Sequence, residues 1–231
     1  MNDGRDADTH SGDETSPHSG AIAWPAPLSG VTESIVTTLG PNDRWNVAAL
    51  GLFAGDTDAD DSVDNADSNT ASDKRPPETA PITARTWGNT RTRRNFHRQG
   101  EGYVQFVTDP VVFADAALTI YEVEKPVLDA ATAWARVSAD PVDSGSDDGT
   151  PWEQWELEPI ETEIERETVP TINRGFNAVI EATVAASRLG VPGYNETTLR
   201  NRLEFFASVV DRAGGPRERL AIERVRAHSD W

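Results

Sequence analysis

The basic segment at residues 83–100 holds the side chains whose types and spacing are best suited to chemistry. The chain carries a formal net charge of −18, yet no Asp or Glu lies between Thr79 and Gly100. Five arginines crowd this stretch: Arg85, Arg91, Arg93, Arg94 and Arg98. Such a cluster can hold an anion such as phosphate. It can equally form surface ion pairs with carboxylates from elsewhere in the chain, each contributing about 0–1 kcal/mol. The segment alone favours neither interpretation.

A short helix is predicted within this segment. Asn89 is typical of a helix N-cap and Gly100 of a helix end, which places Thr90, Arg91 and Thr92 in the first turn. The backbone N–H groups of a first turn have no helical partner and carry partial positive charge. Two hydroxyls and a guanidinium beside them would complete a site for one phosphate group. Arg94 and Asn95 follow Arg91 at three and four positions, on the same face of the helix.

Several other kinds of site are excluded or gain no support. The chain has no cysteine, which excludes disulfides, thiolate catalysis and cysteine-ligated metals. Its four histidines lack metal-ligand spacing, so no metal site is expected. The dinucleotide fingerprint GxGxxG and the P-loop GxxxxGK[ST] are both absent. Alternating glutamates between Glu161 and Glu167 are interpreted as the solvated face of a strand rather than as an acid–base pair.

The overall composition indicates a surface adapted to salt. Asp and Glu total 39 against 21 Lys and Arg, and only Lys74 and Lys125 are lysines. Heavy acid with scarce lysine predicts a protein from the cytoplasm of a salt-loving archaeon. The N-terminus lacks the pattern of a signal peptide, and no apolar run approaches the ~20 residues of a membrane span. A soluble, cytoplasmic protein is therefore expected.

The chain divides into patterned and unpatterned parts. Residues 1–28 are predicted to be a disordered acidic tail, and residues 56–79 and 140–151 to be acidic insertions at the surface. The remaining sequence forms a β-rich body over residues 29–168 and a helical region over residues 169–231. Strands followed by helices favour an α+β fold over alternating α/β.

Periodicity locates the individual elements. Strands are predicted at residues 33–40, 44–55, 80–87, 102–108, 131–139 and 152–167, the first two joined as a hairpin. Besides the basic helix, helices are predicted at residues 109–118, 173–189, 195–214 and 216–228. Asp109 followed by Pro110 forms a helix start, and Asn195 and Gly214 bound another helix.

Five segments in this order resemble an archaeal family known as domain of unknown function 447. They are residues 33–38, 45–51, 90–96, 103–118 and 173–189. Members of that family are similar to the flavin-reductase-like split β-barrels. The resemblance therefore implies a split β-barrel over residues 29–168 with a C-terminal helical segment, and it implies FMN as the cofactor.

The resemblance also implies which residues contact FMN. The phosphate motif of the family, roughly Ser-Arg-Thr-x-x-Asn after a strand, is matched by Thr90, Arg91, Thr92 and Asn95. The turn Asn-x-Ala-Pro is matched by Asn46, Val47 and Ala48, with Ala49 in place of the proline. The backbone of this turn would face the polar edge of the flavin, and Thr38 could reach the same edge. Many family members have Asn at the position of Gln105.

Three functions are compatible with these features. The first is an FMN-binding protein, with an oxidoreductase activity on a substrate that the sequence does not identify. The second is a nucleic-acid-binding module that uses the arginines of residues 85–98. The third is a dimeric scaffold without catalysis. A homodimer is expected because apolar and aromatic residues are abundant in residues 152–160 and in the C-terminal helices. No catalytic residue is assigned.

Overall fold

A closed barrel of six antiparallel strands forms the body of the protein. The computed structural model describes residues 22–55 and 81–231. Its strands are β1 (Gly30–Leu39), β2 (Trp45–Ala54), β3 (Ile82–Trp87), β4 (Glu101–Val107), β5 (Tyr121–Val123), β6 (Ala131–Asp147) and β7 (Thr150–Ile164). The pairing order β1-β4-β6-β7-β3-β2 closes through a β1–β2 pair, and the short β5 adds to β2 outside this ring. The predicted split barrel is thereby confirmed.

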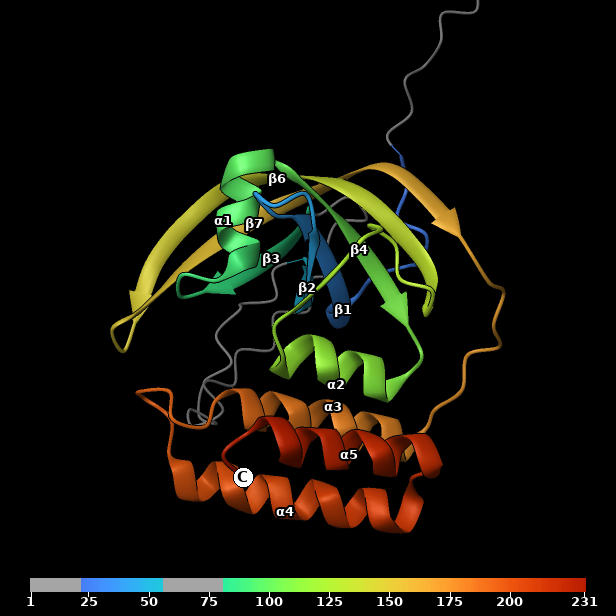
Figure 1. The fold of residues 1–231 in the computed structure, drawn as a ribbon, viewed down its shortest axis with the longest axis vertical. Helices are drawn as coiled ribbons and strands as arrows, with labels where there is room; N and C mark the ends of the chain where they lie inside the picture. Colours follow the sequence, from blue (N-terminus) through green and yellow to red (C-terminus); the bar gives the residue numbers. More distant parts are fainter. Residues whose placement is uncertain (1–21, 56–80) are drawn as a thin grey trace, which may run out of the picture.

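Five helices cover two ends of the barrel. They are α1 (Arg91–Gln99), α2 (Pro110–Leu118), α3 (Arg174–Ser187), α4 (Glu196–Ala213) and α5 (Pro216–His228). Figure 1 shows α1 beside the upper end of the barrel, whereas α2 lies between the barrel and a layer of α3, α4 and α5. The predicted C-terminal helices are therefore present, and α+β is the correct class. Among the described residues, no helix is long and apolar enough to span a bilayer.

Alternation along the strands separates two cores. Val36, Leu52, Val104 and Trp155 point into the barrel and pack with Phe96 of α1. The neighbouring residues of β1 and β2 point the other way. Ile35 and Val47, for example, pack with Phe113 and Ala116 of α2. A two-residue side-chain period thus lets one hairpin serve both cores.

The helical layer has a core of its own, to which α2 contributes. Val111 and Ala114 of α2 are buried in one cluster with residues of all three C-terminal helices. Small residues dominate the α3 face: Ala178, Ala182, Ala185 and Ala186. Gly175 allows the closest approach, since a Cβ there would lie 2.5 Å from the Cα of Gly214. The bundle is therefore built from two parts of the chain that are distant in sequence.

Residues 140–151 form an ordered β-hairpin at the surface, so the prediction that the flanking strands stop at residue 139 and resume at residue 152 is wrong. They lie in β6, in β7 and in the turn between these strands. Asp148 and Gly149 have φ of 44° and 82°, the pair of positive values that a two-residue type I′ turn requires. Asp-Gly is a strong signal for this turn, but the surrounding acidic and small residues obscured it. β6 and β7 are long enough to pair with each other beyond the barrel, and residues 140–151 are therefore called the arm.

Aromatic stacking and a contact with the helical layer anchor the arm. The guanidinium of Arg85 lies 4.0 Å from the centre of the Trp152 ring and 5.7 Å from that of Trp87. Across the hairpin, the Trp152 ring lies so close to Gly145 that a Cβ there would be 2.6 Å from it. At the tip, the Asp148 side chain contacts Gly193 in the α3–α4 loop. The arm is thus held at its base and at its end.

The N-terminal boundary also differs from prediction. Residues 22–28 were assigned to the tail, but Trp24 and Leu28 pack against the barrel core. Residues 1–21 and 56–80, which include the rest of the tail and all of the first predicted insertion, lie outside the described residues. The three-residue β5 was not predicted, because a strand so short has no periodicity to detect.

Candidate functional site

Helix α1 is held firmly at both ends. Thr90 is its N-cap, with extended backbone and a hydroxyl that accepts from the Arg93 N–H at 3.3 Å. Gly100 ends the helix in the left-handed conformation, φ 66°, and its N–H donates to the Phe96 carbonyl. The prediction of Asn89 as the cap is therefore wrong by one residue, because the Thr90 hydroxyl occupies the position three residues before the Arg93 amide. Thr90 accordingly precedes the first turn instead of opening it.

The start of α1 presents free hydrogen-bond donors. Within residues 22–55 and 81–231, no group accepts a hydrogen bond from the backbone N–H of Arg91 or of Thr92. The Thr92 side chain is buried, and its hydroxyl also lacks a partner in this part of the chain. These donors lie within one turn of the Arg91 guanidinium. They form the anion-attracting arrangement expected where the first N–H groups of a helix have no acceptor.

A carboxylate already pairs with the main cation of this site. Arg91 NH1 donates to Glu122 Oε1 at 2.7 Å, with side-chain exposures of 43% and 23%. Glu122 Oε2 accepts from Asn42 Nδ2 at 2.9 Å. Glu122 lies on β5, and Asn42 lies in the β1–β2 turn. The sequence did not indicate either residue, since both are remote from the basic segment and neither belongs to a motif.

A row of three side chains joins Glu122 to the rest of the predicted site. Thr38 of β1 lies opposite Asn46 of β2, and Asn46 lies opposite Glu122 of β5. Directly opposed residues place their side chains on one face of a sheet. Asn95 Nδ2 then donates to the Thr38 hydroxyl at 2.9 Å and to its carbonyl at 3.2 Å. The structure thus brings Thr38, Asn46, Arg91 and Asn95 together around the start of α1.

Val47 and Ala48 are placed differently. The Val47 side chain is buried against α2 on the other face of the sheet, and its backbone lies between β1 and β5. Past Val47, β5 ends, and β3 pairs with β2 only from Leu52 onward. Among the described strands, none pairs with β2 between Val47 and Leu52 on the side that faces away from β1. Ala48–Gly51 therefore have an open backbone edge, next to the row of Thr38, Asn46 and Glu122.

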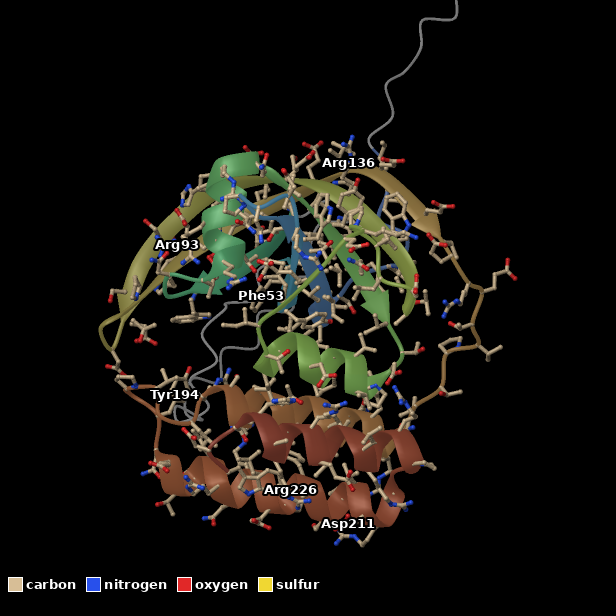
Figure 2. All side chains as sticks on the ribbon, in the orientation of Figure 1. Phe53, Arg93, Arg136, Tyr194, Asp211 and Arg226 are labelled. Carbon is tan, nitrogen blue, oxygen red and sulfur yellow. The ribbon has the colours of Figure 1, made fainter. Side chains whose placement is uncertain are left out.

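Arg93 faces a different part of the barrel. Its Nε donates to Glu153 Oε2 at 2.8 Å, and its NH1 donates to the Gly88 carbonyl. His97, one turn later, contacts the same Glu153 oxygen at 2.7 Å. Figure 2 shows Arg93 between α1 and the β6–β7 hairpin. Arg93 thus attaches α1 to β7, and carboxylates from β5 and β7 reach a segment that has none of its own.

Every arginine of residues 85–98 has a partner within the protein. Besides the pairs above, Arg85 donates to Gln154, Arg94 to Asn89, and Arg98 to the Leu39 carbonyl and Asn95 Oδ1. Asn95 therefore uses both ends of its amide, as donor to Thr38 and as acceptor from Arg98. Its role in the structure is to join α1 to β1.

Gln105 is a second buried amide with a connecting role. Its Nε2 donates to the Pro126 carbonyl at 2.9 Å and to Thr37 Oγ1, and its Oε1 accepts from the Leu128 N–H at 2.7 Å. These bonds fix the loop that follows β5, and with it the position of Glu122. A glutamine in the middle of an apolar strand was the signal that could have revealed this connection.

The described residues contain no candidate metal centre. No group of three or more His, Asp or Glu side chains that could hold a metal ion occurs among them. The hydrogen-bond donors around the start of α1 and the open edge of β2 are therefore the candidate functional site.

Two family models match most of the chain. Residues 32–166 match the family model described as "Protein of unknown function (DUF447) N-terminal domain", and residues 173–227 match the model "Protein of unknown function (DUF447)". No curated protein matches the sequence.

A solved structure shares the fold over most of the chain, and others resemble it more distantly. The FMN-bound protein MM1853 from Methanosarcina mazei, assigned to DUF447, has 20% identity and a TM-score of 0.66, covering 87% of this chain and 96% of that one. Flavoredoxin from Methanosarcina acetivorans has 12% identity and a TM-score of 0.36, covering 64% and 79%. The styrene monooxygenase flavin reductase of Pseudomonas putida S12 has 10% identity and a TM-score of 0.36, covering 61% and 83%.

Proposed function

The chain belongs to the DUF447 family, and on that premise we propose that it binds FMN at the start of α1 and along the open edge of β2. The observation that carries this proposal is the group of unpartnered donors beside Arg91. A phosphate monoester is an acceptor of matching charge and size. The FMN-bound relative, which shares the fold over 87% of this chain, supports the same ligand.

The phosphate would be held by groups of α1. The Arg91 and Thr92 N–H groups and the Thr92 hydroxyl donate to it, and the Arg91 guanidinium supplies the positive charge. The Thr90 hydroxyl already accepts from the Arg93 N–H, so its proton remains available for a phosphate oxygen. Asn95 contributes by holding the helix against Thr38. Glu122 competes for Arg91 and has to give way.

The flavin ring would lie along β2. On the edge of β2 that faces away from β1, backbone groups between Ala48 and Gly51 other than the Leu50 carbonyl, which accepts from Ser34 Oγ, would meet its polar edge. The small side chains of Ala48, Ala49 and Gly51 permit close approach. Thr38 and Asn46 border this edge from the neighbouring row. The bound flavin would supply redox chemistry. The protein would bind and orient it, and an oxidoreductase activity of this kind needs no acid or base from the chain.

No observation favours a nucleic-acid-binding function for residues 85–98. Each arginine there donates to a group of the protein itself. A homodimer remains part of the proposal and is supported by exposed apolar side chains, among them Phe205 at 60% exposure and Ile164. The composition still supports an origin in the cytoplasm of a salt-loving archaeon.

Fluorescence titration with FMN and with riboflavin, which lacks the phosphate, tests the proposed function. Arg91→Ala removes the cation at the site, and charge-assisted hydrogen bonds contribute about 1.5–3 kcal/mol each. We expect FMN affinity to fall about ten- to a hundredfold while riboflavin affinity stays nearly constant. Arg226→Ala, which removes the same charge from α5 in the helical layer (Figure 2), is the matched control. Equal losses for both ligands, or for both variants, would contradict the proposal.

A further inference from the structure

Glu122 is fixed in place at the mouth of the candidate phosphate site. Its backbone pairs with Asn46 in the sheet, and its carbonyl accepts from Arg44 NH2 at 3.2 Å. Its carboxylate bridges Asn42 and Arg91, one oxygen to each. With both ends of the residue anchored, the negative charge stands against Arg91 rather than moving freely in solvent.

This position makes Glu122 a rival of any anion that binds there. Arg91 NH1 lies 2.7 Å from a Glu122 oxygen, so a phosphate oxygen on the same guanidinium would approach a like charge within a few ångströms. Like charges placed together without a cation between them repel strongly when they are partly buried. A phosphate must therefore take Arg91 from Glu122 or bind beside it at a cost. Neutral ligands such as riboflavin meet no such competition.

We propose that Glu122 is a built-in competitor that occupies Arg91 in the absence of ligand and restricts the site to dianionic phosphate monoesters. This inference rests on the proposed FMN site and adds the residue that sets its selectivity. A singly charged ion such as chloride carries the same charge as the Glu122 carboxylate but has no second hydrogen bond to Asn42. Chloride therefore does not displace Glu122 from Arg91. A phosphate dianion reaches the unpartnered helix N–H groups as well as Arg91. These additional contacts allow it to displace Glu122.

The test compares Glu122→Gln with Glu124→Gln. The first removes the charge but keeps the size and an oxygen acceptor for Asn42. The second removes the same charge two residues away, from a side chain that is 83% exposed and pairs only loosely with Arg44 at 3.6 Å. Both variants and the wild-type protein are titrated with FMN and riboflavin, and inorganic phosphate is used to displace FMN. Circular dichroism checks that each variant is folded.

We expect Glu122→Gln to raise FMN affinity about five- to thirtyfold and to strengthen competition by inorganic phosphate. Riboflavin affinity stays within about twofold, and Glu124→Gln resembles the wild type. The gain shrinks between about 0.15 M and about 1 M salt, as the Debye length falls from about 8 Å to about 3 Å.

The outcomes separate the two proposals. If the wild type binds FMN and Glu122→Gln binds it equally or less well, the competitor role is wrong and the FMN site stands. A loss of affinity in that variant would instead make Glu122 a positioning partner of Arg91. If only Glu122→Gln binds FMN, the competitor role is supported, and the wild type is not an FMN-binding protein. If neither binds FMN, both proposals fail.

Discussion

The amide of Asn95 joins two elements by donating to both the hydroxyl and the carbonyl of Thr38, at 2.9 Å and 3.2 Å. Asn95 is 3% exposed, so its loss leaves buried polar groups without partners. We expect Asn95→Ala to lower the free energy of unfolding by about 1–3 kcal/mol. Urea denaturation measures the change, with the exposed Asn89→Ala as control. Equal stability of the two variants would show that this junction contributes nothing.

Glu153 carries the second attachment of α1, to Arg93 and His97. We expect Glu153→Gln to lower the free energy of unfolding by about 1–2 kcal/mol, because a buried charge-assisted acceptor is replaced by a neutral one. Arg93→Ala should likewise reduce stability while the ratio of FMN to riboflavin affinity stays constant. A change in that ratio would place Arg93 in the phosphate site and contradict the geometry.

Tyr121 should make the free energy of unfolding fall as the pH becomes alkaline. Burial, reinforced by the negative charge of Asp115, raises the pKa of Tyr121 to about 12. The unfolded chain releases this proton near pH ~10, so between there and about 12 the folded state holds more protons. Stability contributed by Tyr121 is therefore present below pH ~10 and is lost as the pH rises through this window.

Urea denaturation at a series of pH values measures this effect, and Tyr121→Phe is the comparison. Phenylalanine keeps the contacts with α2 but has no proton to lose. We expect the free energy of unfolding of the variant to decline less steeply over the window. Parallel curves for wild type and variant would assign the alkaline loss of stability to other groups.

The homodimer is tested by light scattering in molar KCl. We expect twice the mass of one chain at micromolar concentration, because apolar residues such as Phe205, Leu220 and Ile164 are exposed on the monomer. Phe205→Asp should shift the equilibrium toward the monomer if α4 lies in the interface. A strict monomer would remove the dimer from the proposal.

Much of the fold was predictable because local signals agreed with tertiary structure. The Asp109–Pro110 helix start and the Asn195 cap follow from backbone chemistry within a few residues. The split barrel itself came from a resemblance over ordered segments, which the family and structural matches confirm. Periodicity identified β1 and β2 as strands, but it could not show that their opposite faces belong to two cores.

The candidate site was harder to predict from the sequence, because its contacts depend on strand register. Glu122 is isolated in sequence and belongs to a strand too short to predict, yet the pairing of β5 with β2 places it on Arg91. The composition of the basic segment therefore could not reveal the carboxylates of β5 and β7 that pair with its arginines. Thr90 and Asn89 are both residue types that commonly cap helices. Whether α1 begins after one or the other decides which backbone N–H groups lack an acceptor.

The sharing of α2 between barrel and bundle has a consequence for synthesis on the ribosome. Residues 110–118 emerge before β6 and β7 and well before residues 174–228, yet Val111 and Ala114 are buried in one cluster with residues of α3, α4 and α5. A nascent chain that has made the barrel but not yet residues 174–228 must therefore expose the apolar stripe of α2. A chain that lacks residues 174–228 would keep that stripe exposed, so the packing of α2 is complete only when α3, α4 and α5 have joined it.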